Sequence, residues 1–374
     1  MGNPEKILEQ ALNRASANIA TPLIKNRKVL ERTEYVCRCL QNRAGVRLLM
    51  ACLLAKIDRP AIDPRKPYTE IGDPDAFSGR HYDEAYITHF INEHRLPCNP
   101  TTAFLTPALR NIDRTLTKDV EIVGRPRQLY IYTLQLLDDV YNKRTSPKDL
   151  LAEAIRILLV MRNEKDSRMA TLLAGLRQSG DNMPLSSEAI ANLIEQHLNC
   201  KNSSRLPVLV VAAAYQTAGD KIGERLLPLK GHNAADEQTG AMGDVEICLV
   251  NDDQIVTAYE MKMKRVTIDD IDRALQKIAT ATTHIHNYLF ITTDAIDEPV
   301  KAYAAEAYEH TGGTEIAILD CLGFLRHFLH LFHRLRIAYL DTYQNLVLSE
   351  PDSAVSQPLK EAFLALRQAA EADE

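Results

Sequence analysis

The sequence predicts an α/β fold: a mixed central sheet flanked by helices, preceded by a mostly helical region. Two observations support this fold class. After residue 200, short extended apolar segments alternate with helical patterns, which is typical of strands joined by helices. Over most of residues 1–200, apolar residues recur at helical spacing. The 374 residues exceed what one core normally holds, so we expect more than one domain.

Residues 1–200 are expected to form helices separated by proline-rich loops. The helical patterns cover 5–57, 81–93, 127–142, 147–162 and 186–198. Pro, Asp and Gly residues mark a loop at 58–80, and three prolines mark another around 96–106. Ser187 is the expected N-cap of the last helix.

Residues 201–348 are expected to hold the sheet, and 349–374 a polar helix or tail. The predicted order is a helix at 206–227, strands at 244–250 and 255–263, a helix at 268–283, a strand at 287–293, a helix at 298–310, a strand at 315–319 and a helix at 322–346. Strands that alternate with helices in this way indicate a sheet with helices on its faces.

Charge is unevenly distributed along the chain. The formal net charge is −6, yet residues 1–200 hold 28 Lys and Arg against 24 Asp and Glu, whereas residues 201–374 hold 16 against 26. The first region could therefore carry a basic surface, and the acidic second region could supply carboxylates for a metal ion. An acidic second half is also ordinary for a soluble domain.

Cysteine usage and hydropathy indicate a reduced, cytoplasmic protein. The seven cysteines are scattered and form no CxxC pair. No apolar run reaches the ~18 residues of a membrane span. The polar start of the chain does not resemble a signal peptide.

Four charged residues occur where two predicted strands meet in a hairpin. Asp244 and Glu246 alternate on the first strand, and Glu260 and Lys262 alternate on the second. A three-residue turn at 252–254 would place Glu246 opposite Glu260 and Asp244 opposite Lys262. All four side chains would then share one face of the sheet.

Clustered carboxylates repel one another unless protons or a cation intervene. Carboxylate oxygens suit Mg²⁺, which often also contacts phosphate. A lysine beside such a site can stabilise the charge that develops during phosphodiester hydrolysis. The alternative interpretation is a solvated charged face, but the apolar residues around these four suggest strands that are buried on both faces.

Asp244 followed, after a hairpin, by Glu260-Met261-Lys262 resembles the motif of the PD-(D/E)xK nucleases. The order of helices and strands over about 206–319 is also similar to the core of that superfamily. The resemblance implies that Asp244 and Glu260 bind Mg²⁺ and that Lys262 helps to activate water. Glu246 is a further candidate ligand because it shares their face of the sheet. Gly243 stands where the motif name has proline. The family also implies a further acid from the preceding helix, for which Glu224 is the candidate; pairing with a neighbouring cation is the alternative.

Within this superfamily, the size of the chain and its added helical region resemble a type II restriction endonuclease. The segments 97–111 and 232–236 are similar to the SacI family. This resemblance implies sequence-specific cleavage of double-stranded DNA by a homodimer, as part of a restriction-modification system. The alternatives are another nuclease with the same core, acting in defence or repair, and a catalytically inactive DNA-binding protein with the same fold.

Several polar residues are candidate DNA contacts. Those before the first strand and those after the second lie beside the predicted site, and a third group flanks the proline-rich turns of the first region. They are His232, Asn233, Asp236, Gln238 and Thr239, then Lys264 and Arg265, then Asn99, Arg110 and Asn111. Turn formation, capping and surface solvation are the alternative roles.

Overall fold

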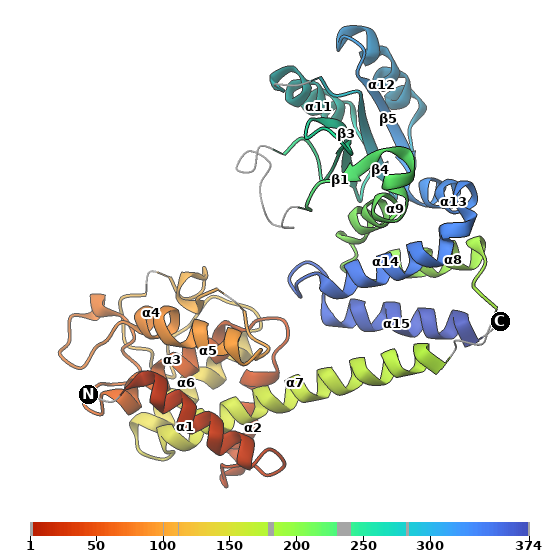
Figure 1. Cartoon of the computed structure of the whole chain (residues 1–374). Coiled ribbons are helices and arrows are strands. Elements are labelled where there is room, and N and C mark those ends of the chain that lie inside the picture. Colours follow the sequence, from red (N-terminus) through yellow and green to blue (C-terminus); the bar gives the residue numbers. More distant parts are fainter. Residues whose placement is uncertain are drawn as a thin grey trace. The chain divides into compact units, whose positions relative to one another are not determined.

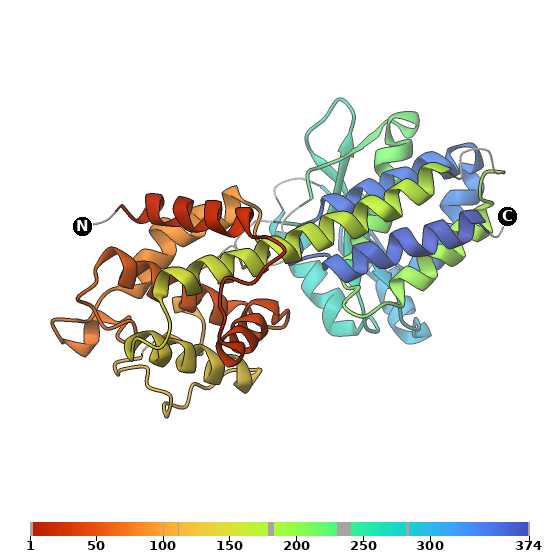
Figure 2. The same ribbon diagram turned by 90° about the horizontal axis from the view of Figure 1, so that it is seen from below.

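The chain forms two compact units, Met1–Ser167 and Arg168–Glu374 (Figure 1). The computed structural model describes residues 3–99, 101–110, 112–178, 183–229, 241–281 and 284–372. The sequence predicted a boundary at residue 200, whereas the units divide inside helix α7 (Pro147–Gln178). Figure 2 shows α7 as one long helix, and a polar stretch at 162–168 coincides with the division within it.

The first unit is helical around one apolar core. Its helices are α1 (Pro4–Ala17), α2 (Arg27–Arg38), α3 (Ala44–Asp58), α4 (Gly79–Tyr82), α5 (Thr88–Glu93), α6 (Arg127–Tyr141) and the first part of α7. A π-helical turn at Asp83–Ile87 joins α4 to α5, and short 3₁₀ turns lie at Thr69–Ile71 and Ala103–Leu105. Helix α3 is buried on nearly all sides, which is expected of a helix that is apolar all round.

A buried ion pair lies inside this unit. The side chains of Arg47 in α3 and Asp83 are fully buried, and their charged groups are 2.7 Å apart. The second carboxylate oxygen of Asp83 accepts hydrogen bonds from the hydroxyl of Thr102 and the N–H of Ala103, each at 2.7 Å. Arg47 also donates to the carbonyl of Asn99. The pair therefore ties Asn99, Thr102 and Ala103 to the helical core.

The second unit contains a five-stranded mixed sheet in the order β1-β2-β3-β4-β5. Its strands are β1 (Glu224–Leu226), β2 (Val245–Leu249), β3 (Ile255–Lys262), β4 (Asn287–Thr292) and β5 (Glu315–Asp320). The first three strands pair antiparallel, and β3, β4 and β5 pair parallel. This confirms the predicted mixed sheet flanked by helices.

Helices cover both faces of the sheet (Figure 1). On one face, β2 and β3 contribute Val245, Ile247 and Tyr259 to a core shared with α9 (Leu206–Ile222) and α13 (Cys321–Leu331). On the other face, strand residues pack against α11 (Ile268–Thr280) and α12 (Glu298–His310). These strand residues are Ala258, Tyr288, Phe290, Ile316 and Ile318.

Two predicted helices of the second unit differ from the structure. The helix expected over 206–227 ends at Gly223, whose positive φ of 76° suits a residue without a Cβ, and the short strand β1 follows it. The helix expected over 322–346 is two helices, α13 and α14 (Arg336–Ser349), separated by a 3₁₀ turn. No proline or glycine lies at this break.

Helices outside the sheet complete this unit. The N-cap of α8 (Ser187–Leu198) is Ser186, not the predicted Ser187, because the Ser186 hydroxyl accepts the N–H of Ala189. The C-terminal segment forms α15 (Gln357–Ala372), with Phe363 and Leu364 fully buried. None of the helices in the described ranges is long and apolar enough to span a bilayer.

One histidine joins three of these helices. His197 of α8 is fully buried, and its Nε2 lies 3.0 Å from the carbonyl oxygen of Leu359 in α15. Because a carbonyl only accepts, Nε2 carries the proton, and Nδ1 then accepts from the Tyr343 hydroxyl of α14 at 3.0 Å. Burial lowers the pKa of His197 to about 4, against the weaker opposing effect of the bond to Leu359.

Removal of one charge from the buried pair should destabilise the first unit. We expect Asp83→Asn to lower the free energy of unfolding by about 3–5 kcal/mol, because Arg47 would remain charged and buried without a counter-charge. Urea unfolding followed by circular dichroism measures this effect. The matched control is Glu84→Gln: its partner Arg80 and Glu84 are both exposed, so a loss below about 1 kcal/mol is expected. Equal losses in the two variants would contradict the role of the pair.

His197 should make the second unit sensitive to acid. The folded protein binds this proton less readily than the unfolded chain, whose histidine titrates near the ordinary value of 6.5. Its contribution to stability is therefore complete above pH 6.5 and is lost as the pH falls from 6.5 towards 4. Between pH 7 and pH 5 we expect a loss of about 1–2 kcal/mol from this residue. Glutamine can replace both hydrogen bonds without titrating, so urea unfolding of His197→Gln should show a smaller loss. An unchanged pH dependence in this variant would refute the assignment.

Candidate active site

The pairing of β2 with β3 places the predicted charged residues on one face. Val245 pairs with Tyr259 and Glu246 with Ala258, and the register shifts at a bulge between Ile247 and Cys248. The predicted pairing of Glu246 with Glu260 is wrong by two residues, because the connection between the strands is longer than a three-residue turn. Side chains alternate with a period of two, so this even slip leaves them on the predicted face. Continued by one residue, the register sets Asp244 opposite Glu260.

Asp244 stands just before β2 and is exposed. Its Oδ2 accepts a hydrogen bond of 2.8 Å from the backbone N–H of Met261. This bond fixes the carboxylate beside the end of β3, next to Glu260.

The residue before Asp244 has to be small. A Cβ on Gly243 would lie 2.5 Å from the carbonyl oxygen of Tyr259 and 3.0 Å from its carbon, which is closer than real Cβ atoms approach. Glycine at this position, where the motif name has proline, therefore lets the chain that carries Asp244 lie against β3.

Glu260 and Lys262 form the charged end of β3. The Nζ of Lys262 is 3.2 Å from Oε1 of Glu260 and 3.2 Å from Oδ1 of Asp270. The two carboxylates are largely buried, with exposed side-chain fractions of 16% for Glu260 and 10% for Asp270. Lys262 is thus held between two acids, and its charge offsets the cost of burying them.

Asp270 is fixed by the start of α11. Its Oδ2 accepts hydrogen bonds from the N–H of Thr267 at 2.9 Å and from the Thr267 hydroxyl at 2.8 Å, in a capping box. Burial alone would raise the pKa of Asp270, but these bonds, a bond from Arg273 and the charge of Lys262 lower it to about 2. Asp270 is therefore a fixed anion that holds Lys262.

Glu246 lies on the same face but deeper. Its side chain is buried, and its Oε1 accepts a hydrogen bond of 2.7 Å from the N–H of Met242. Glu246 thus anchors the segment that leads into Asp244. Its predicted role as a metal ligand stays a prediction.

Three residues of this cluster, Asp270, Lys277 and Tyr288, were not predicted from the sequence. Oε2 of Glu260 is 3.4 Å from Nζ of Lys277 and accepts a hydrogen bond of 3.3 Å from the hydroxyl of Tyr288. Asp270 and Lys277 are seven residues apart on α11, a spacing that places them on one helix face. Such a spacing is common in helices, so it signals no site until the packing of the helix on the sheet is known.

The candidate additional acid, Glu224, is not brought to this cluster. It is the first residue of β1 instead of part of the preceding helix, and it pairs with Leu249. In the same pairing Leu226 lies opposite Ile247, so Glu224 and Leu226 share the sheet face that packs against α9. Burial raises the pKa of Glu224, but its carboxylate lies on the other face from Glu260.

The candidate DNA contacts beside the site are only partly described. Lys264 is exposed, whereas Arg265 pairs with Asp297 at 2.9 Å and Asp294 at 3.7 Å. His232, Asn233, Asp236, Gln238 and Thr239 lie outside the described residues.

The candidate contacts of the first unit lie in or near one loop. Arg110 and Arg80 line a hollow of about 330 Å³ together with Tyr68, Thr69 and Ser78. Asn99 is exposed and its carbonyl accepts from Arg47. Asn111 falls outside the described residues.

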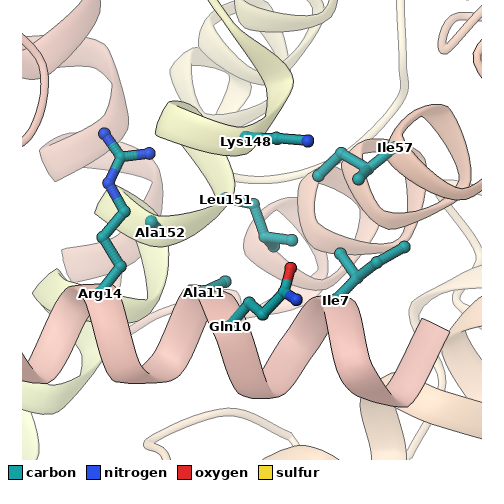
Figure 3. Close-up of a pocket in the computed structure, with 8 residues that line it drawn as sticks. All are labelled: Ile7, Gln10, Ala11, Arg14, Ile57, Lys148, Leu151 and Ala152. Carbon is teal, nitrogen blue, oxygen red and sulfur yellow. The ribbon is translucent and has the colours of Figure 1, made fainter. Parts of the chain in front are cut away.

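A second hollow of the first unit, of about 150 Å³, lacks the groups needed for hydrolysis (Figure 3). It lies between α1, α3 and α7 and is lined by Ile7, Gln10, Ala11, Arg14, Ile57, Lys148, Leu151 and Ala152. None of these side chains is acidic or nucleophilic, and Arg14 pairs with Asp149 at 2.5 Å. The charged cluster on β3 is therefore the stronger candidate for an active site.

The donor set of this cluster suits a hard cation that arrives with a phosphate. Within the described part of the chain, no group of three or more His, Cys, Asp or Glu side chains is arranged to hold a metal ion. Mg²⁺ in phosphoryl-transfer sites is commonly held by one or two carboxylates together with water and substrate phosphate. Asp244 and Glu260 fit that pattern.

In a comparison with known families, the segment that carries the charged cluster is similar to a restriction endonuclease domain. Residues 182–293 match the family described as the SacI restriction endonuclease C-terminal domain. The match confirms the resemblance noted in the sequence. It spans the chain from α8 to β4 and includes Asp244, Glu260 and Lys262. No curated protein matches the chain.

Proposed function

We propose that the protein is a type II restriction endonuclease that hydrolyses phosphodiester bonds of double-stranded DNA at a specific sequence, with Mg²⁺ as its cofactor. The carrying observation is the position of Lys262, 3.2 Å from Glu260, beside an Asp244 carboxylate that is bonded to the adjacent Met261. This arrangement lies inside a segment of the SacI family, and a restriction endonuclease acts on DNA.

Each residue of the cluster has a distinct role in this proposal. Asp244 and Glu260 would hold the cation, which when bound neutralises charge on the scissile phosphate. Lys262 keeps a positive charge at the end of β3, where it can orient the attacking water and stabilise the negative charge that develops on the phosphate oxygens. Asp270 positions Lys262 through the 3.2 Å contact.

The proposal includes a homodimer with two-fold symmetry. A homodimer presents one active site to each strand of a palindromic sequence. The exposed loop residues of the first unit, with Lys264, would contribute DNA contacts.

The catalytic proposal predicts a metal requirement and three essential residues. We expect plasmid cleavage into discrete bands with Mg²⁺ or Mn²⁺, and none with excess EDTA or with Ca²⁺, which binds oxygen ligands but is a weaker Lewis acid. Asp244→Ala, Glu260→Ala and Lys262→Ala should each lower the cleavage rate by about 10²-fold or more, because each removes charge stabilisation at the phosphate. DNA affinity in Ca²⁺, measured by fluorescence anisotropy, should change little.

Lys301→Ala is the matched control, because this exposed lysine of α12 pairs with Glu298 outside the cluster. Undiminished cleavage in EDTA would contradict the metal mechanism, and wild-type turnover by Lys262→Ala would contradict the role of that lysine. A smear of products would indicate a nuclease without sequence specificity. Binding without any cleavage would favour the inactive DNA-binding protein.

Recognition by the first unit can be tested at Arg110. If its guanidinium reads a base, Arg110→Ala should weaken binding to the cognate duplex by ~1–3 kcal/mol and leave mismatched duplexes almost unaffected. Anisotropy titrations at a fixed salt concentration measure this difference. Arg27→Ala is the control, since Arg27 is highly exposed and pairs only with its helical neighbour Glu31 among the described residues. An equal loss on all duplexes would identify a phosphate contact, and no loss on any duplex would exclude Arg110 from the DNA interface.

A further inference from the structure

The carboxylate of Glu260 is occupied on both of its oxygens by groups of this chain. Oε1 contacts Lys262 at 3.2 Å, and Oε2 contacts Lys277 at 3.4 Å and the hydroxyl of Tyr288 at 3.3 Å. The exposed fraction of the Lys277 side chain is 27%, so its charge is partly shielded from water. The proposed mechanism requires one cation, Lys262, and assigns nothing to Lys277.

We propose that the ammonium group of Lys277 occupies the position at Glu260 that a divalent cation would take, so that the cation has to displace this group. The inference rests on the proposed function, since it concerns the same carboxylate. Lys277 thereby acts as a positioning residue for Glu260 and as a built-in competitor for the metal.

The argument follows from charge and geometry. Without a cation, a largely buried carboxylate next to Asp244 and Asp270 is unfavourable unless positive charge is close. Lys262 supplies part of this charge but is shared with Asp270 at an equal distance of 3.2 Å. Lys277 supplies the remaining positive charge. Its contact also holds Oε2 in the position from which this oxygen can bind a metal ion.

This competition has a functional consequence. Two carboxylates alone bind Mg²⁺ weakly, and the substrate phosphate normally completes the set of ligands. With Lys277 at Glu260, the protein without DNA binds divalent cations more weakly still. Metal binding is favoured when the phosphates of DNA supply further oxygen ligands. Lys277 thus couples metal binding to the presence of the substrate.

The test is cation binding to the full chain without DNA. Isothermal titration with Mn²⁺ should show a site that is lost in Glu260→Gln and that binds about 3- to 10-fold more tightly in Lys277→Gln than in the wild type, as expected for removal of one partly exposed ion pair. Lys277→Arg keeps the charge and should resemble the wild type. Lys301→Gln makes the same chemical change on α12, where the lysine pairs with Glu298, and should also resemble the wild type. Thermal melts verify that each variant is folded.

Equal or weaker Mn²⁺ binding by Lys277→Gln overturns the inference, as does the absence of a Glu260-dependent site in both proteins. Tighter binding that also occurs in Lys301→Gln overturns it too, because the effect would then be a general one of net charge. The proposed function is judged separately, by plasmid cleavage with Mg²⁺. Cleavage by the wild type together with unchanged Mn²⁺ binding in Lys277→Gln would leave the nuclease proposal intact and remove the role of Lys277.

Discussion

The alternation of side chains along β2 and β3 is the constraint on which the candidate site depends. On these strands the apolar residues Val245, Ile247 and Tyr259 face α9 and α13, while Glu246 and Glu260 face α11. A slip of one residue would exchange the two sets and bring carboxylates into the apolar core, at a cost of several kcal/mol per unpaired charge. The register can therefore shift only in steps of two, and the site survives such a shift.

This constraint explains which parts of the site could be predicted from the sequence. Asp244, Glu260 and Lys262 belong to one hairpin, so period-two alternation was sufficient to place them on one face. Asp270 and Lys277 could not be found in this way, because their contacts depend on how α11 packs against the sheet. Apolar spacing determines which face of a helix is buried, but it does not determine which polar residues at the margin of that face reach a given carboxylate.

The errors at the level of the fold have a similar origin. The strand β1 has only three residues, and so short a segment directly after an apolar helix cannot be distinguished from the end of that helix. The compact units divide within α7, which continues to Gln178 through a polar stretch at 162–168, and the predicted boundary at residue 200 stays a prediction. The buried pair of Arg47 and Asp83 could not be predicted from the sequence either, because its members are 36 residues apart in the chain and come together only in the folded unit.

Gly243 limits how far the sequence of this site could be changed towards the motif of the superfamily. The motif name places proline before the first aspartate, and a designer guided by consensus would restore it. A proline carries the same Cβ that would meet the carbonyl of Tyr259 at 2.5 Å, and its ring adds further atoms. Here the residue that departs from the motif is the one that this backbone requires, and the variant closest to the motif would separate the two strands that bring the acids together.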